Sequence, residues 1–249
     1  MEHGITIHLA PAIVGHIGDI AITSTLITSW LTIGVLVLFA VYMKKSARLV
    51  PNRFQVLVEA TIGGAYDYVE ETLEDKNLAA KYFPILATIF FFILAANWIG
   101  LLPGVTSIGY YGISHGVRAL IPFLYPVNTD LNITIALALI AFVTIEYAGI
   151  SVVGALKYFG KFVTFKSPLA FFIGLIELIS EFGRLLSFSF RLFGNIFAGK
   201  TLLLVAIFFL PYIVPVPIMA FELFVGFIQA VVFALLTLFF IKLAVAEPH

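Results

Sequence analysis

The chain has 249 residues, of which 61% are hydrophobic and only 11% are charged, and its mean hydropathy is +1.10. This balance excludes an ordinary soluble domain and is typical of an integral membrane protein. The formal net charge is zero, so no electrostatic argument favours nucleic acid as a partner. The absence of cysteine excludes disulfides, thiolate zinc sites and cysteine catalysis. The histidines are too scattered to predict a metal site, and we expect no cofactor. They are His3, His8, His16, His115 and His249.

Residues 1–19 form a polar tail, and the first apolar run starts near Ile20. It has no basic segment before it and is long enough to span a bilayer, so we expect a retained helix over 21–43, not a cleaved signal. A basic cluster follows it directly, which marks the cytoplasmic side of the membrane.

Residues 52–76 are amphipathic, with apolar positions such as Phe54 and Val58 set against a row of acids. This segment is too polar to span the membrane, and we expect a helix on the cytoplasmic surface. A soluble linker helix fits the same pattern. The acids are Glu59, Asp67, Glu70, Glu71, Glu74 and Asp75.

Two further spans are predicted over 83–102 and 131–152. The first holds Asn97 and closes at the turn Leu102-Pro103-Gly104. The second is entered through Asp130 and Asn132 and holds Glu146 near its exit. Between them, 103–127 is an aromatic and proline-rich loop that contains His115. We expect the amides to line a channel or to hydrogen-bond between helices, and Asp130 to line a channel or to cap the helix that begins there.

The lysines and arginines outside the last hairpin fall mainly on one side of these spans. Arg118 alone lies on the other side. The N-terminus is therefore predicted outside and the C-terminus in the cytoplasm. The residues on the cytoplasmic side are Lys44, Lys45, Arg48, Arg53, Lys76, Lys81, Lys157, Lys161 and Lys166.

The stretch 168–210 is almost entirely apolar but carries several charged residues. A continuous helix of this length would measure roughly 60 Å, about twice the hydrocarbon thickness of a bilayer, so it must tilt strongly or bend. At about 100° per residue, its polar groups fall within one narrow stripe. Those groups are Glu177, Glu181, Arg184, Arg191 and Asn195.

Prolines at 211, 215 and 217 end this segment, and a last apolar helix is expected over 218–244. Glu222 and Gln229 are seven residues apart, so they lie on one face of it. The fold class predicted is an all-α polytopic membrane protein with three upright spans, one surface helix and a long tilted hairpin over 168–244. We treat residues 1–249 as a single membrane domain.

Charge inside a membrane span costs at least about 2.5–3.5 kcal/mol per group on insertion scales, and ion pathways usually compensate for it. Arg191 has no acid within one helical turn, and its guanidinium stays protonated, so it suits a fixed cation and not a proton carrier. For Arg184, an internal ion pair with Glu181 is equally compatible.

Residues 194–201 read GNIFAGKT and match the string of a phosphate-binding loop. That motif requires a preceding strand and an exposed glycine loop with access to nucleotide. Here the string lies inside a predicted membrane helix, so we exclude a nucleotide site.

Residues 186–199 read LSFSFRLFGNIFAG. This segment resembles the signature of subunit a of the F-type ATP synthase, the membrane stator that faces the rotating ring of c subunits. The resemblance covers the chain from about Asn52 to the C-terminus, and the length suits the shorter bacterial members. Other positions that agree with the family are Asn97 before the Leu-Leu-Pro turn, Asp130-Leu131-Asn132, Glu177 and Gln229.

The resemblance implies ion translocation that drives ATP synthesis elsewhere in the complex, with Arg191 meeting a carboxylate of the ring. The ion, proton or sodium, would be set mainly by subunit c. The expected outer half-channel contains Asn195, Glu222 and Gln229, and the inner one contains Glu177, Ser180, Glu181 and Ser187. Further half-channel residues are Asn97, Asp130, Asn132 and Lys200.

Lys200 and Glu222 depart from the family pattern, in which many bacterial members have Glu and His at these positions. Either the two side chains form a pair across the helices, or Lys200 extends outward and Glu222 alone handles the proton. The pair is our preferred interpretation.

The implied partners are the c-ring, the b-subunit peripheral stalk, the rest of the synthase and the lipid bilayer. The expected location is a bacterial plasma membrane, with an organellar energy-transducing membrane as the alternative. Two other function classes stay open. A stand-alone secondary transporter would show inverted repeats, which we do not find, and a purely structural scaffold would not need so many polar groups in one hairpin.

Overall fold

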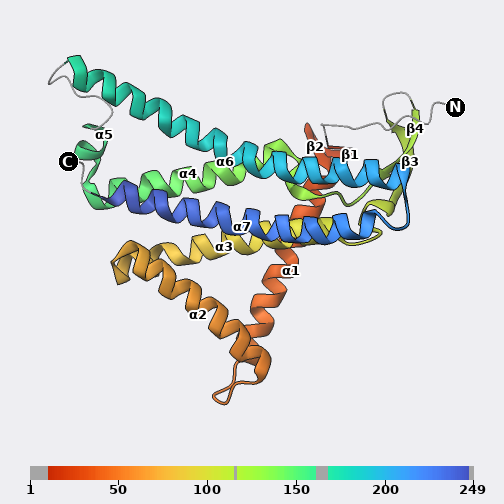
Figure 1. Cartoon of the computed structure of the whole chain (residues 1–249), viewed down its shortest axis with the longest axis horizontal. Helices are drawn as coiled ribbons and strands as arrows, with labels where there is room; N and C mark the ends of the chain where they lie inside the picture. Colours follow the sequence, from red (N-terminus) through yellow and green to blue (C-terminus); the bar gives the residue numbers. More distant parts are fainter. Residues whose placement is uncertain (1–10, 115–116, 161–167, 247–249) are drawn as a thin grey trace. The chain divides into compact units, whose positions relative to one another are not determined.

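The computed structural model describes residues 11–114, 117–160 and 168–246, and helices dominate it (Figure 1). His115, Lys161 and Lys166 lie outside the described residues. Within these described residues, five helices are long and apolar enough to cross a membrane, which confirms the polytopic all-α class. They are α1 (Ser24–Ser46), α3 (Lys76–Leu101), α4 (Leu131–Val153), α6 (Pro168–Phe209) and α7 (Pro215–Val245).

The first span begins three residues later than predicted because the chain before it pairs as a hairpin. Strands β1 (Ile13–Ile17) and β2 (Ile20–Thr23) are antiparallel, and Gly18 between them has φ +61°, a conformation that glycine adopts without strain. Helix α1 then starts because the Thr23 hydroxyl accepts a hydrogen bond from the Leu26 N–H at 3.2 Å.

The amphipathic segment forms α2 (Arg53–Leu73), as predicted. Asn52 caps its start, with Oδ1 accepting from the Gln55 N–H at 2.7 Å, and Glu74 ends it in the left-handed region at φ +57°. The next span starts seven residues before its predicted boundary because the Asp75 carboxylate accepts from the N–H groups of Asn77 and Leu78.

Helix α3 ends at the predicted turn, where Gly104 has φ +86°. The following loop contains the short 3-10 helices η1 (Val105–Ser107) and η2 (Val127–Thr129), and a second hairpin formed by β3 (Gly109–Ser114) and β4 (Val117–Pro122). Neither hairpin was predicted, since its strands do not alternate strictly between apolar and polar residues. Helix α4 ends at Val153, and Gly154, at φ +87°, leads into the short α5 (Ala155–Gly160).

The long charged segment forms one continuous helix, α6, of 42 residues. At about 1.5 Å per residue it measures roughly 63 Å. Helix α7 begins at Pro215, at the first helical position, where proline's missing N–H costs nothing. The predicted pair of long helices is confirmed.

By compactness the chain divides into two units, and α3, α4, α6 and α7 contribute residues to both. Whether they make a single membrane domain stays a prediction. Unit 1 contains Met1–Pro51, Phe90–Ile133 and Leu192–Val231, and unit 2 contains Asn52–Ile89, Thr134–Arg191 and Val232–His249.

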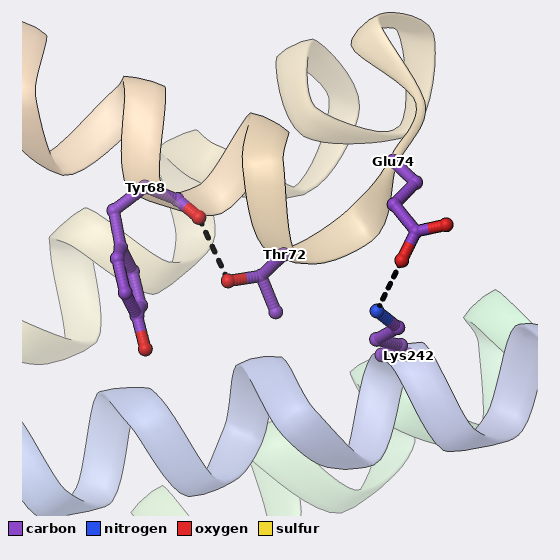
Figure 2. A network of polar contacts seen from close by, with 4 residues as sticks. All are labelled: Tyr68, Thr72, Glu74 and Lys242. Atoms are coloured by element: carbon purple, nitrogen blue, oxygen red, sulfur yellow. Dashed lines mark hydrogen bonds and ion pairs between the residues drawn. The ribbon is translucent and has the colours of Figure 1, made fainter.

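In unit 2, one ion pair connects the end of α2 to the end of α7. The Lys242 Nζ lies 2.7 Å from the Glu74 Oε1 (Figure 2). In the turn before it, the Thr72 hydroxyl donates to the Tyr68 carbonyl oxygen at 2.8 Å, as the same figure shows. Lys242 holds the pKa of the Glu74 carboxyl below its usual value, first by hydrogen bonding and then by charge.

Because the pKa of Glu74 is lower in the folded chain, this pair stabilises the fold above the unfolded pKa of about 4.3 and stops doing so as pH falls through the folded value. We expect a double-mutant cycle of Glu74→Gln and Lys242→Met to give a small positive coupling in the unfolding temperature at neutral pH and low salt. The coupling should be small because both side chains are exposed, and high salt should reduce it. A coupling that stays unchanged at pH below about 4 would contradict this assignment.

Candidate functional site

Helix α6 carries a row of exposed polar side chains on an otherwise apolar surface. Ser180, Ser187, Arg191 and Asn195 are all exposed, and their spacings of seven and four residues place them on one helical face. The Arg191 Nη2 donates to the Ser187 hydroxyl at 3.4 Å. We call these four residues the α6 polar stripe.

Apolar side chains border the stripe. Leu186 is 50% exposed and Phe190 53% exposed, which suits contact with lipid or with another apolar helix. A permanently charged guanidinium therefore lies on the outer surface of a membrane helix, accessible to a neighbouring protein.

A second group of predicted residues lines a small cavity within unit 1. The cavity has a volume of about 20 Å³. One water molecule needs about 10–15 Å³ of such space, so the cavity can hold a water. Glu222 is only 5% exposed and Asn97 only 3%, so their polar ends face the interior. The lining consists of Asn97, Gly100, Leu101, Pro126, Ile196, Lys200 and Glu222.

Glu222 packs directly against the α6 backbone at Gly199. A Cβ at position 199 would lie 2.0 Å from the Glu222 Oε2 and 2.1 Å from Oε1, so only glycine allows this approach. The Glu222 carboxylate therefore occupies the space that a side chain at position 199 would take.

Lys200 lines the same cavity, but among the described residues no ion pair joins it to Glu222. Its Nζ lies over the Tyr125 ring, 5.6 Å from the ring centroid, a cation–π contact that compensates a partly buried ammonium. The preferred interpretation, a Lys200–Glu222 pair, is not what the structure shows, since the aromatic ring takes the place of the carboxylate. Burial raises the pKa of the Tyr125 hydroxyl, so it stays neutral beside the cation.

Asn97 makes hydrogen bonds between helices, which is one of the two roles predicted for it. Its Nδ2 donates to the Gly226 carbonyl oxygen at 3.0 Å, and its Oδ1 accepts from the Asn128 Nδ2 at 2.7 Å. A Cβ at Gly226 would lie 3.0 Å from the Asn97 Cβ, so this contact is close. The side chain can hold these bonds and still border the cavity.

Asp130 acts as a cap, as one of the two interpretations predicted. Its Oδ1 accepts from the Asn132 N–H at 3.0 Å, and its Oδ2 accepts from the Thr25 hydroxyl at 2.7 Å. Asn132 is exposed and Gln229 is half-buried. The structure does not bring these two residues into the cavity lining.

In unit 2, Arg184 forms an ion pair with Glu181, which is the internal pair that the sequence allowed. Glu181 is only 3% exposed, and the Arg184 guanidinium lies over the Phe240 ring at 4.7 Å. Glu177, one turn earlier on α6, is half-buried. In the described part of the chain, no three His, Asp or Glu residues are grouped so that they could hold a metal ion.

Sequence reasoning missed several polar neighbours of these sites. Thr25 and Thr28 on α1 are buried; Thr25 contacts Asp130, and the Thr28 hydroxyl accepts from the Tyr125 N–H at 2.9 Å. A visible signal existed, because hydroxyl residues recur every three or four positions along the first turns of this span. The buried ones are Ser24, Thr25, Thr28, Ser29 and Thr32.

Comparison with known proteins agrees with this architecture. Residues 26–242 match the family model described as ATP synthase A chain. The chain is 34% identical to ATP synthase subunit a of Geobacter sulfurreducens over 97% of its own length and 94% of that protein. It is 35% identical to ATP synthase subunit a of Campylobacter curvus over 86% of its length and 88% of that protein. With the five apolar helices found in its described residues, the chain is an integral membrane protein and belongs to the ATP synthase subunit a family.

Proposed function

We propose that this chain is the stator subunit of a proton-translocating ATP synthase, and that it passes protons to and from a rotating ring of c subunits. The observation that carries the proposal is the α6 polar stripe, with an exposed arginine in an apolar helix of 42 residues. A ring carboxylate that approaches Arg191 from a neighbouring protein would be favoured in its ionised form.

Arg191 separates two half-channels in this mechanism. The guanidinium cannot release its proton at any relevant pH, so it blocks direct passage of protons and does not carry them. A proton must instead travel on the ring carboxylate. One charge crossing 100 mV is worth about 2.3 kcal/mol, so several protons are needed for each ATP.

The outer half-channel includes the water-sized cavity beside Glu222, where a buried carboxylate can take up and release a proton. Its proposed residues are Asn97, Asp130, Asn132, Asn195, Lys200, Glu222 and Gln229. The inner half-channel contains the buried Glu181 and the exposed hydroxyls of α6. Its proposed residues are Glu177, Ser180, Glu181 and Ser187.

The proposed partners are the c-ring, the b-subunit peripheral stalk and the rest of the synthase. Relatives from bacteria favour a bacterial plasma membrane. The basic segments after α1 and α4 favour an outside N-terminus and a cytoplasmic C-terminus. We propose no nucleotide or other cofactor on this chain.

The test is reconstitution into liposomes, with the purified chain alone and with the purified complex. A stator should copurify with a c-ring and a soluble ATPase head, and only the whole complex should pump protons when ATP is added. A secondary transporter, the alternative function, would translocate its substrate alone. Transport by the isolated chain would refute the proposal.

A further inference from the structure

Unit 2 contains a buried polar cluster that includes two residues with no role in the mechanism so far. The Tyr158 hydroxyl on α5 and the Glu146 Oε1 on α4 are fully buried. Tyr158 lies within electrostatic reach of Glu146 and of the Glu181 and Arg184 side chains on α6, which pair with each other. Tyr158 is 2% exposed and Glu181 3% exposed. Three separate helices therefore bring four polar side chains into one interior position.

The Tyr158 ring is held in place by close packing against a helix backbone. A Cβ at Gly149 on α4 would lie 2.2 Å from the Tyr158 Cε2 and 2.8 Å from Cζ, so the ring lies against the glycine itself. Gly154, at φ +87°, turns the chain from α4 into α5, and its carbonyl oxygen accepts from the Tyr158 N–H at 2.9 Å. The direction of the phenol is thus fixed by two glycines.

The Tyr158 hydroxyl remains protonated at physiological pH. Burial, followed by the charge and hydrogen bonding of Glu146 and the charge of Glu181, raises the pKa of Tyr158 far above its ordinary value. Tyr158 therefore keeps a proton that its hydroxyl can donate to a neighbouring carboxylate, and it does not itself exchange protons.

Among these four residues there are two carboxylates and one guanidinium. Arg184 pairs with Glu181, so the charges of the cluster balance when one proton is added. Burying an excess charge is energetically costly. One carboxylate of the cluster is therefore favoured in its protonated form and can bind a proton in transit.

Charged groups on the other packed helices make contacts elsewhere. The Lys81 ammonium on α3 lies over the Tyr147 ring at 4.9 Å, and the Tyr82 hydroxyl lies 3.2 Å from the Ser151 hydroxyl. Helix α7 contributes the aromatic ring of Phe240 beneath Arg184. Glu177 lies one turn before Glu181 on α6.

We infer that Glu146 is a further proton-carrying group of the inner half-channel and that Tyr158 is its positioning residue. This inference rests on the proposed function, because it assigns the cluster to one of the two half-channels. Glu146 extends the inner path from α6 to α4.

The test measures ATP-driven proton pumping by the whole complex in vesicles while the pH on the side of the ATPase head is varied. Glu146→Gln should lower the rate at least about tenfold, since general acid–base groups contribute about 10²–10⁴-fold. Tyr158→Phe keeps the packing on Gly149 but removes the donor. Removing a donor beside a carboxylate disfavours its ionised form, so the head-side pH dependence should shift upward by about one pH unit.

Tyr147→Phe is the matched control, because Tyr147 follows Glu146 in the sequence and is 57% exposed. The substitution keeps the aromatic ring that Lys81 lies over. It should leave the rate and the pH dependence unchanged. All rates are normalised to the amount of assembled complex. If Glu146→Gln does not assemble, the shift in Tyr158→Phe decides the question.

The inference is overturned if Tyr158→Phe matches Tyr147→Phe in pH dependence, or if Glu146→Gln pumps like the wild type. A loss that is equal at every pH would indicate a purely structural role and would also overturn it. An Arg191→Ala complex measured in parallel distinguishes failure of the proposed function from failure of the inference about Glu146 and Tyr158. Pumping that survives Arg191→Ala contradicts the proposed function itself, whereas unaffected Glu146 and Tyr158 variants contradict only this inference.

Discussion

Replacing Glu222 with leucine is expected to slow proton uptake from the outer side about a hundredfold, within the range that acid–base groups contribute. The carboxylate is buried beside a water-sized cavity, and leucine cannot take up or release a proton. Lys200→Leu should cost far less, about threefold at most, because its ammonium faces the Tyr125 ring and packing is the main loss. The measurement is ATP synthesis driven by an imposed proton gradient in vesicles, normalised to assembled complex.

The packing of Gly199 provides a second variant for the same prediction. Gly199→Ala places a methyl group where the Glu222 carboxylate now lies, so it should reduce proton uptake while both ionisable residues remain. Gly34→Ala on α1 is the control, since a Cβ there meets nothing within 4 Å. Equal losses in Glu222→Leu and Lys200→Leu, or no loss in either, would contradict the assignment of Glu222.

The membrane helices could be predicted from the sequence because each depends on local information. Apolar runs of sufficient length indicate spans, and the prolines mark the junction of the two long helices, with Pro211 in the break and Pro215 and Pro217 in the first turn of α7. The Glu181–Arg184 pair was also accessible, because residues three apart on a helix are neighbours. Boundaries were less accurate where a capping side chain decided them, as at Thr23 and Asp75.

The contacts between distant segments could not be predicted in the same way. The sequence offers Lys200 two kinds of partner, the Glu222 carboxylate and any of many aromatic rings. Only the packing of the loop before α4 brings the Tyr125 ring to it. Tyr158 looks like an ordinary aromatic residue after a span, and its burial depends on a glycine nine residues earlier. Spacing alone also placed Glu181 and Arg191 on one stripe, whereas Glu181 is buried and Arg191 is exposed.

Arg191→Ala is expected to abolish coupled transport, with a loss of at least a hundredfold, as when a preorganised charge-stabilising group is removed. Without a permanent cation on the α6 polar stripe, nothing favours the ionised form of a ring carboxylate as it passes. Arg191→Lys should not restore full activity, since an ammonium lacks the planar fork of donors that a guanidinium presents to a carboxylate. Arg53→Ala, at the start of α2, is the control for loss of a positive charge and should retain pumping.

ATP-driven acidification of vesicles that carry the whole complex, with wild type and Arg191→Ala compared in the presence and absence of sodium, tests the central claim most directly. We expect the wild type to acidify the vesicles and Arg191→Ala to give no acidification in either condition, while the ATPase head remains bound. Acidification at the wild-type rate by Arg191→Ala would show that the exposed guanidinium of α6 does not control proton transfer, and would contradict the account.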